Sequence, residues 1–501
     1  MSELKTLYRH ALHYLSGRVC LMLLGFLSFP VFTRVFSVSD YGTMGLVLKV
    51  ILLLTVIGKF GLQNSVQRFY AEDGASLDAN KRRRYYSTLF FGAASIGALA
   101  SLLFITILLL APSAALSAEL RYLFTITAVL IFIRSVQPAL IGFLRAEGKT
   151  KTYNLVEIAI KAATVLLACV LLLTWRRTLA VFFGSTIIVE LLGVVALLFY
   201  LYRRDLLNLN ALDWSYFRTA TVFAVPLIGY ELASVILDSG DRLLVQRYLG
   251  SQSLGYYSAA YSVSTYVEES LMIPINLALF PIYMKIWVEK GRQETQAFLS
   301  RSLNNFLALA VAIICVVFLT SRDVIVVLAS KKFQEAHQLL PVLVIGLLIY
   351  AVHIFLNAAL LIHRKTTMMT ALVAYACGVN IVLNIILLPR IGIQGAAIAT
   401  LVSYLFLVIL MGKVSFRLLP LSINYVAFAA NLLSAVLTYA VVSQLSFQKA
   451  ILSAGVKGSL GLFLYAILVS MINPVVRAEV LERMSSAKKK PKPSESELVA
   501  H

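Results

Sequence analysis

Charged side chains are scarce in this sequence. Asp, Glu, Lys and Arg together make up 14% of its 501 residues, while 60% are hydrophobic. Soluble domains carry about 25% charged residues and about 45–50% apolar ones. Such a low charge content excludes an ordinary soluble domain. We predict an all-α polytopic membrane protein.

Cysteine is also rare. The four cysteines, Cys20, Cys169, Cys315 and Cys377, all lie within apolar runs, with no CxxC pair and no His/Cys spacing typical of metal sites. A disulfide framework and a zinc site are therefore not expected.

Motifs for catalysis and nucleotide use are missing. The sequence contains no GxxxxGK[ST], no GxSxG and no HExxH, the patterns of phosphate-binding loops, serine hydrolases and zinc proteases. The loops between apolar runs are short and leave no room for a soluble catalytic domain. We therefore predict that the protein is not an enzyme and has no bound organic cofactor.

The formal net charge of +20 comes mainly from Lys and Arg in these short loops. That distribution is typical of cytoplasmic loops facing anionic lipid and does not indicate nucleic-acid binding. When successive loops are assigned to alternate sides, 25 of the 44 basic residues fall on one side and nine on the other. We predict that both termini are cytoplasmic and that the tail after Pro474 is disordered.

Apolar runs of the length that crosses a bilayer, about 20 residues, occur about fourteen times. The predicted spans are 14–36, 41–63, 86–112, 120–144, 152–175, 178–202, 218–240, 256–284, 302–320, 337–362, 367–389, 392–416, 421–444 and 451–472.

Spans 1–6 and 7–12 form an internal repeat. An offset of 213 residues relates Arg34 to Arg247 and Gly42 to Gly255, at matching turns after the first and seventh spans. Repeats of this kind are typical of secondary transporters, with a site between the repeats near the membrane midplane. The predicted domains are an N-terminal lobe (1–204), a C-terminal lobe (205–417), spans 13 and 14 (418–473) and a cytoplasmic tail (474–501).

The seventh span carries charges that are costly in hydrocarbon. Glu231, Ser234, Asp238 and the pair Asp241/Arg242 recur at three- and four-residue steps, so they form one stripe on a helix. We interpret this stripe as part of an aqueous pathway. For Asp241 and Arg242 alone, a structural ion pair near the membrane surface is equally consistent.

Buried charges in the first lobe are mostly cationic. They are Arg18, Lys49, Arg134 and Lys161. A cavity lined in this way would attract an anion such as a phosphate or diphosphate, because Arg offers bidentate geometry and Lys a point charge. The alternative for Lys161 is a simple i,i+4 pair with Glu157.

The second lobe is richer in acids and amides. Asn380 and Asn384 lie one turn apart in the eleventh span. They either hydrogen-bond neighbouring helices or contribute to a small-cation site, since hard cations prefer oxygen ligands. Other residues expected to line a cavity are Arg34, Arg242, Glu268, His353 and Asn357.

Three segments resemble polysaccharide repeat-unit flippases. They are SGRVCLMLLGFLSFPVFTRVFSVSDYGTMGL from Ser16, LDSGDRLLVQRYLGSQSLGYYSAAYSV from Leu237, and PRIGIQGAAIATLVSYLF from Pro389. The resemblance implies the multidrug/oligosaccharidyl-lipid/polysaccharide exporter superfamily, with fourteen helices as two six-helix lobes plus two. It implies an inner-membrane flippase for an undecaprenyl-diphosphate-linked oligosaccharide of an O-antigen, capsule or exopolysaccharide. Its partners would be that lipid-linked sugar, membrane lipids and the polysaccharide polymerase machinery.

The resemblance also implies a coupling ion. Related lipid II flippases carry a sodium site in the second lobe, and Asp238, Asn380, Asn384 and Thr400 stand in similar places here. Asn384 departs from that pattern, which has Asp, so one negative charge fewer is available. Coupling to protons through Asp238 or Glu231 is the alternative, and Asp241 is a further candidate for the coupling ion.

Two other functions compete with the flippase. A multidrug exporter of the same superfamily would favour cationic substrates. The basic residues of the first lobe argue against this function. A membrane polymerase or ligase acting on the same sugars is expected to carry a large extracytoplasmic loop, and no long loop separates the predicted spans.

Overall fold

The computed structural model describes residues 2–63, 65–66, 78–112 and 116–478; the side chains of 2–14, Ala79 and Pro226 are not described. The part of the predicted tail from residue 479 onward lies outside the described residues. The chain divides into two compact units. The larger contains 1–282 and 328–418, and the smaller contains 283–327 and 419–501.

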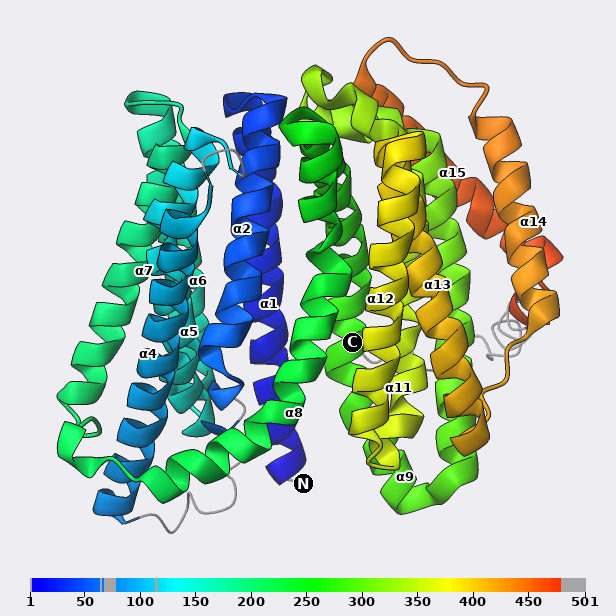
Figure 1. Ribbon diagram of the computed structural model, residues 1–501. Helices are drawn as coiled ribbons and strands as arrows, with labels where there is room; N and C mark the ends of the chain where they lie inside the picture. The colour runs from blue at the N-terminus through cyan, green and yellow to red at the C-terminus, as the bar shows by residue number, and fades with distance from the viewer. Residues whose placement is uncertain (1, 64, 67–77, 113–115, 479–501) are drawn as a thin grey trace, which may run out of the picture. The chain divides into compact units, whose positions relative to one another are not determined.

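The larger unit consists of two helical bundles, which we call the first and second lobes (Figure 1). The first lobe contains α1 (Ser2–Val35), α2 (Val38–Lys59), α4 (Ala79–Leu110), α5 (Ala118–Ala146), α6 (Thr150–Thr174) and α7 (Leu179–Tyr202). The second lobe contains α8 (Trp214–Ser239), the start of α9 (Asp241–Ala329), α10 (Leu340–Ala351), α11 (His353–Ile362), α12 (Thr366–Ile391) and α13 (Ile393–Leu418), with the short helices η2 (Leu209–Ala211) and η3 (Lys331–Gln338) in the connections.

The smaller unit contains residues 283–327 of α9 together with α14 (Tyr425–Val442) and α15 (Ala450–Ile472). The Tyr465 hydroxyl donates a 3.0 Å hydrogen bond to the Ala308 carbonyl, which ties α15 to α9. No strand occurs within the described ranges, and the prediction of an all-α fold is confirmed.

The count of about fourteen spans depends on α9. Twelve helices of the described chain are long and apolar enough to cross a membrane, and one of them runs over 103 residues from Leu227 to Ala329. A straight helix of that length would reach about 150 Å, far beyond the roughly 30 Å hydrocarbon core. Gly250 and Gly291 have φ angles of +79° and +80°, outside the right-handed helical range. Together with the α8–α9 boundary at Gly240, these breaks leave three segments of bilayer-spanning length: α8, the part of α9 between Gly250 and Gly291, and the part after Gly291. Counting them separately brings the total to the predicted number.

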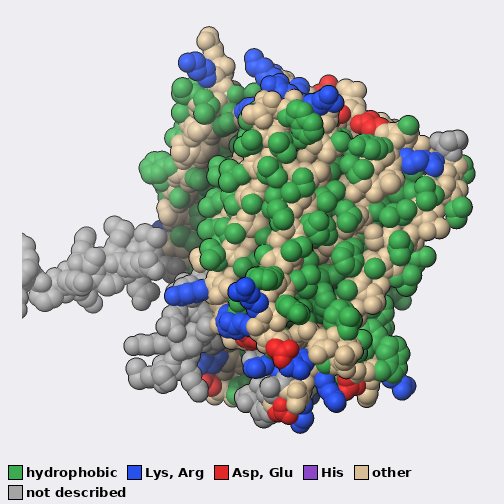
Figure 2. Space-filling model, turned by 90° about the vertical axis from the view of Figure 1, so that its left-hand side faces the viewer, with side chains coloured by type: hydrophobic (Ala, Val, Ile, Leu, Met, Phe, Trp, Pro, Cys, Tyr) green, Lys and Arg blue, Asp and Glu red, His purple; other side chains and the backbone are tan. Residues whose placement is uncertain are grey.

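The outer surface of the first lobe matches a lipid environment. The face in Figure 2 is covered by hydrophobic side chains over its middle, while Lys, Arg, Asp and Glu gather at its two ends. Exposed side chains on α4 and α7 include Leu102, Ile107, Leu192 and Phe199. Apolar side chains are stable there only if lipid covers them, so the chain is a multi-pass membrane protein.

Candidate functional site

Two ion pairs join the lobes along α2 and α8. The Lys49 ammonium lies 3.0 Å from Asp238 Oδ2, and Lys59 pairs with Glu231 near the C-terminal end of α2. Both acids belong to the predicted stripe of the seventh span. Both lysines come from the first lobe, so each acid is neutralised across the lobe boundary.

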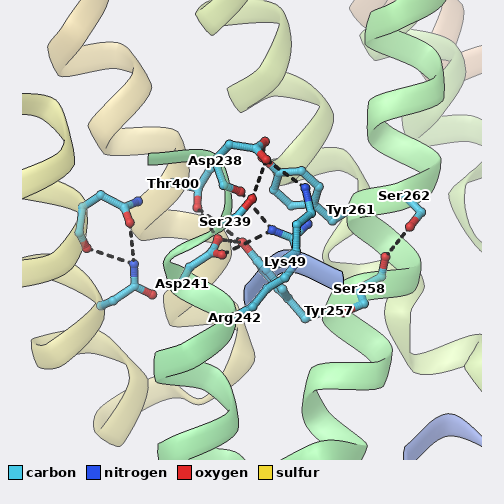
Figure 3. A network of polar contacts seen from close by, with 12 residues as sticks. Lys49, Asp238, Ser239, Asp241, Arg242, Tyr257, Ser258, Tyr261, Ser262 and Thr400 are labelled. Carbon is cyan, nitrogen blue, oxygen red and sulfur yellow. Dashed lines mark hydrogen bonds and ion pairs between the residues drawn. The ribbon is translucent and has the colours of Figure 1, made fainter. Parts of the chain in front are cut away.

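Asp238 is the most highly coordinated acid of this site (Figure 3). Besides Lys49, its carboxylate accepts hydrogen bonds of 2.6 Å from the Ser239 hydroxyl and 2.6 Å from the Tyr261 hydroxyl. The Tyr261 oxygen also lies 3.1 Å from the Tyr404 oxygen on α13. Both carboxylate oxygens of Asp238 are therefore engaged in this conformation.

A cavity of about 530 Å³ opens beside this acid. We call it the central cavity; it is lined by Gln63, Leu227, Tyr230, Glu231, Ser234, Val235, Asp238 and Tyr350. Gln63 comes from the first lobe and the others from the second. Three of the predicted stripe residues therefore share one cavity, whereas Asp241 does not line it.

Arg242 connects the two aspartates. Its Nη1 donates a 2.9 Å hydrogen bond to the Asp238 carbonyl and lies 3.6 Å from Asp241 Oδ1. Its guanidinium carbon is 4.3 Å from the centre of the Tyr261 ring, a cation–π arrangement. Arg242 and Asp241 are both buried in the protein rather than at its surface.

Asp241 is the deepest acid in the site, with no exposed surface. The Tyr257 hydroxyl donates to its Oδ2, and the Thr400 hydroxyl donates to the same oxygen at 3.3 Å. Its other oxygen, Oδ1, accepts no hydrogen bond in the described structure. The family resemblance groups Thr400 with Asp238, whereas in this structure the Thr400 hydroxyl donates to Asp241.

Asn380 and Asn384 pair with each other along α12. The Asn384 amide nitrogen donates to the Asn380 carbonyl at 2.9 Å and to its side-chain oxygen at 3.1 Å. Asn384 Oδ1 and Asn380 Nδ2 find no partner among the described residues, although both side chains are buried. Helix α12 packs against α8, which carries Asp238, and against α13, which carries Thr400.

This donor set suits a small hard cation. Such an ion prefers oxygen ligands. The structure offers the Thr400 hydroxyl and two buried oxygens that accept no described hydrogen bond, Asp241 Oδ1 and Asn384 Oδ1. Across the described ranges, no group of three His, Cys, Asp or Glu side chains could hold a metal ion. A site here would therefore depend on amides and hydroxyls as well as one carboxylate.

A second polar cavity lies within the first lobe. It measures about 260 Å³, and we call it the first-lobe cavity; its ionisable lining residues are Arg134, Glu157, Lys161 and Glu190. Arg134 makes a bidentate pair with Glu190, with distances of 2.9 Å and 2.7 Å. The four charges sum to zero. Glu190 was missed from the sequence, although a single acid within the apolar run of the sixth span could have indicated it.

Other predicted cavity residues are scattered. Arg18 is exposed and makes no ion pair with a described side chain. Arg34 binds the carbonyls of Pro30 and Leu328, at 2.9 and 3.1 Å, away from the central cavity. His353 stacks on Tyr350 with ring centres 4.3 Å apart, and Asn357 is buried with Oδ1 lacking a partner in the described structure. Glu268 is half-buried on α9.

Comparisons with known proteins agree with this architecture. A family model described as polysaccharide biosynthesis protein matches residues 7–287. The probable low-salt glycan biosynthesis flippase Agl15 of Haloferax volcanii is 22% identical over 189 residues, 36% of this chain and 40% of that protein. The succinoglycan biosynthesis transport protein ExoT of Rhizobium meliloti is 23% identical over 293 residues, 57% of this chain and 55% of that protein. The matches span about half the length of these relatives.

Solved structures share the fold. The lipid II flippase MurJ in an inward closed conformation aligns with a TM-score of 0.70 at 15% identity, over 93% of this chain and 98% of that one. An inward-facing multidrug resistance MATE transporter aligns with a TM-score of 0.65 at 12% identity, over 81% of this chain and 97% of that one. Flippases and multidrug exporters therefore have this fold in common.

Proposed function

The chain belongs to the polysaccharide biosynthesis protein family, whose model matches residues 7–287, and from this premise we propose that it is a flippase for a lipid-linked oligosaccharide. In this proposal it moves an undecaprenyl-diphosphate-linked repeat unit across the bacterial inner membrane, from the cytoplasmic to the outer leaflet, by alternating access. Both termini are cytoplasmic, and the polymerase machinery at the outer leaflet takes up the product.

The central cavity is the observation that carries the proposal. It lies against both lobes of a multi-pass membrane protein and is lined by Gln63, Tyr230, Glu231, Ser234 and Asp238. Hydroxyls, amides and carboxylates hydrogen-bond to sugars, whereas a lipid-facing surface offers none of these groups. The proposed path takes the sugar through this cavity while the lipid tail remains in the bilayer.

The diphosphate requires cations that are available to bind it. Among the four basic residues expected to do so, Lys49 and Arg134 are paired with acids in this conformation. Arg18 and Lys161 form no ion pair with a described residue. In our proposal these two meet the diphosphate first, and Arg134 contributes only if it releases Glu190.

The proposed driving force is a small cation, Na⁺ or H⁺, bound by the second lobe. The uncommitted oxygens of Asp241 and Asn384 and the Thr400 hydroxyl support this assignment, with Asn380 orienting Asn384. This set replaces Asp238 of the expected sodium site by Asp241. A bound cation can bias the lobe equilibrium only if it binds one conformation more tightly than the other.

A multidrug exporter is the second candidate, because the MATE transporter shares the fold. Exporters of cationic drugs need an excess of acids facing the substrate. Here Glu231 and Asp238 in the central cavity are each paired with a lysine. This charge balance favours the flippase.

A deletion strain distinguishes the two. We would measure surface-polysaccharide display and, in parallel, the leaflet distribution of extracted lipid-linked intermediates. Lost display with intermediates held on the cytoplasmic leaflet supports the flippase, and their sugars identify the substrate. Normal display with altered sensitivity to cationic drugs would overturn it in favour of the exporter.

A further inference from the structure

The Lys49 ammonium lies beside the acids that would bind a coupling cation. We infer that the Lys49 ammonium and the coupling cation compete for the acidic centre of the second lobe, so that each is bound only when the other is absent. This inference rests on the proposed cation-coupled transport and assigns the residue that links ion binding to lobe movement.

The ion pairs of Lys49 and Arg242 involve four charged groups, of which only one belongs to the first lobe. Asp238, Asp241 and Arg242 lie at the junction of α8 and α9, while Lys49 reaches them from α2. With Lys49 in place, two negative and two positive charges balance. Without it, the second lobe keeps two aspartates and one arginine, a net charge of −1.

The contacts of Asp238 indicate which ones would survive lobe separation. The hydroxyls of Ser239 and Tyr261, each 2.6 Å from the carboxylate, belong to the second lobe and would stay with it. Both are neutral donors. Lys49, 3.0 Å away, is the cationic contact that would be lost when α2 moves from α8.

Arg242 supplies a single positive charge for two carboxylates, so it cannot replace Lys49 at Asp238 and still neutralise Asp241. Its Nη1 is already committed to the Asp238 carbonyl at 2.9 Å and lies 3.6 Å from Asp241 Oδ1. Asp241 Oδ1 still accepts no hydrogen bond from a described group. A small cation at this oxygen would restore the balance that Lys49 provides in the closed arrangement.

Competition follows from electrostatics in a partly dehydrated site. Like charges a few ångströms apart repel more strongly there than in water. Arg242 repels such a cation in both arrangements, since it stays 3.6 Å from Asp241 Oδ1. A cation near Asp241 would therefore bind more weakly while Lys49 remains than after Lys49 withdraws. By linkage, cation binding favours separation of α2 from α8, and return of Lys49 expels the cation.

Lys59 provides a matched control within the molecule. It also reaches from α2 to an acid of α8, pairing with Glu231. Its partner Glu231 lies almost two helical turns from Asp238, and no ion pair or hydrogen bond joins Lys59 or Glu231 to Asp241 or Arg242 in the described structure. Removing Lys59 therefore breaks a pair between the lobes without changing the charge at the cation site.

The test is Na⁺ binding to the purified full-length protein, measured by calorimetry against choline. We expect Lys49→Met to bind Na⁺ about tenfold more tightly than the unmodified protein, and Lys49→Arg, which keeps the charge, to behave like the unmodified protein. Lys59→Met should change the affinity less than twofold. Adding Asp241→Asn to Lys49→Met should abolish the gain.

Three results would overturn the inference: unchanged or weaker Na⁺ binding by Lys49→Met, an equal gain in Lys59→Met, or a gain that survives Asp241→Asn. Lys49→Gln replaces Lys49→Met if the latter fails to fold. Failure here is distinguishable from failure of the flippase proposal, because that proposal is judged by polysaccharide display and leaflet distribution, whatever the Na⁺ affinity.

Discussion

Gly42 on α2 and Gly255 on α9 touch at the crossing of the two repeats. A Cβ added to Gly42 would lie 2.6 Å from the Gly255 backbone nitrogen and overlap the Ser251 carbonyl oxygen, while a Cβ added to Gly255 would overlap the Val38 carbonyl oxygen. Val38 and Ser251 are separated by the same 213 residues as the two glycines. The contact is therefore reciprocal, as an approximate two-fold relationship requires.

Side chains at this crossing should prevent the lobes from meeting. We predict that Gly42→Leu or Gly255→Leu abolishes transport, because no backbone atom at the contact can retreat without moving a helix. The measurement is polysaccharide display in the deletion strain, with protein level determined in membranes. Gly378→Leu is the control, since a Cβ at Gly378 meets nothing within 4 Å. Normal display by both glycine variants would exclude this crossing as a required contact.

The ion pair Arg134–Glu190 either binds substrate or only stabilises the first lobe, and substitutions can distinguish the two roles. We predict that Arg134→Ala abolishes transport at a normal protein level if the guanidinium binds diphosphate during the cycle. Loss of the arginine also leaves Glu190 without its bidentate partner. Removing one member of a fully buried pair costs about 3 kcal/mol or more. Display and membrane protein level should be measured together.

The exchanged variant Arg134→Glu/Glu190→Arg separates these two effects. A purely structural pair should function in either orientation, so the double variant should regain both protein level and display. A diphosphate ligand should not be restored, because the guanidinium then projects from α7 instead of α5. Recovered display would therefore contradict a role for Arg134 in binding substrate.

The Asn384 side chain is neutral, so the proposed cation site contains only one carboxylate, that of Asp241. We predict that Asn384→Asp strengthens Na⁺ binding by about tenfold, since it adds a second carboxylate to the set that contains Asp241 and Thr400. Sodium-dependent thermal stabilisation of the purified protein is the readout. Asn357→Asp is the control, a buried amide on α11 that has no described contact with Asp241. Equal stabilisation of both variants would place the ion elsewhere.

The fold could be predicted from the sequence because the lipid bilayer constrains the composition and length of each span. Spans must be apolar and about 20 residues long, so four of the first six helices could be located within four residues at both ends. Helices α1 and α4 begin earlier than predicted, at Ser2 and Ala79 instead of residues 14 and 86. The segment from α8 to α9 was harder to define. Gly250 and Gly291, where φ is positive, divide a nearly continuous helical run, and a glycine in an apolar run does not by itself reveal a break.

The site was only partly accessible for a different reason. Helical periodicity places residues on one face of their own helix, and Glu231, Ser234 and Asp238 do share the central cavity. Periodicity gives no information about partners on other helices. Arg134 pairs with Glu190, and Thr400 with Asp241, because of the way their helices pack. Helix packing cannot be read from the local order of residues.

The lobes also meet at the turn joining α1 and α2. The Lys332 ammonium, from η3, donates to the carbonyls of Phe36 and Arg34, the latter at 3.1 Å. The Arg34 guanidinium in turn donates to the Leu328 carbonyl at 3.1 Å. Each cation thus binds the carbonyls at the end of a helix of the opposite lobe, where the helix dipole favours positive charge.

We predict that Lys332→Met weakens this contact and increases opening of the lobes at that end. The readout is labelling by a membrane-impermeant thiol reagent of Ser262→Cys, in a background without the four native cysteines. Ser262 suits this purpose because its hydroxyl lies 3.3 Å from that of Tyr41 on α2, across the same lobe boundary. Labelling should rise several-fold in Lys332→Met and remain unchanged in Lys331→Met, since both lysines are exposed but only Lys332 hydrogen-bonds to a described residue. A rise in both variants would mean that positive charge in η3, rather than the Lys332 hydrogen bonds, holds the lobes together.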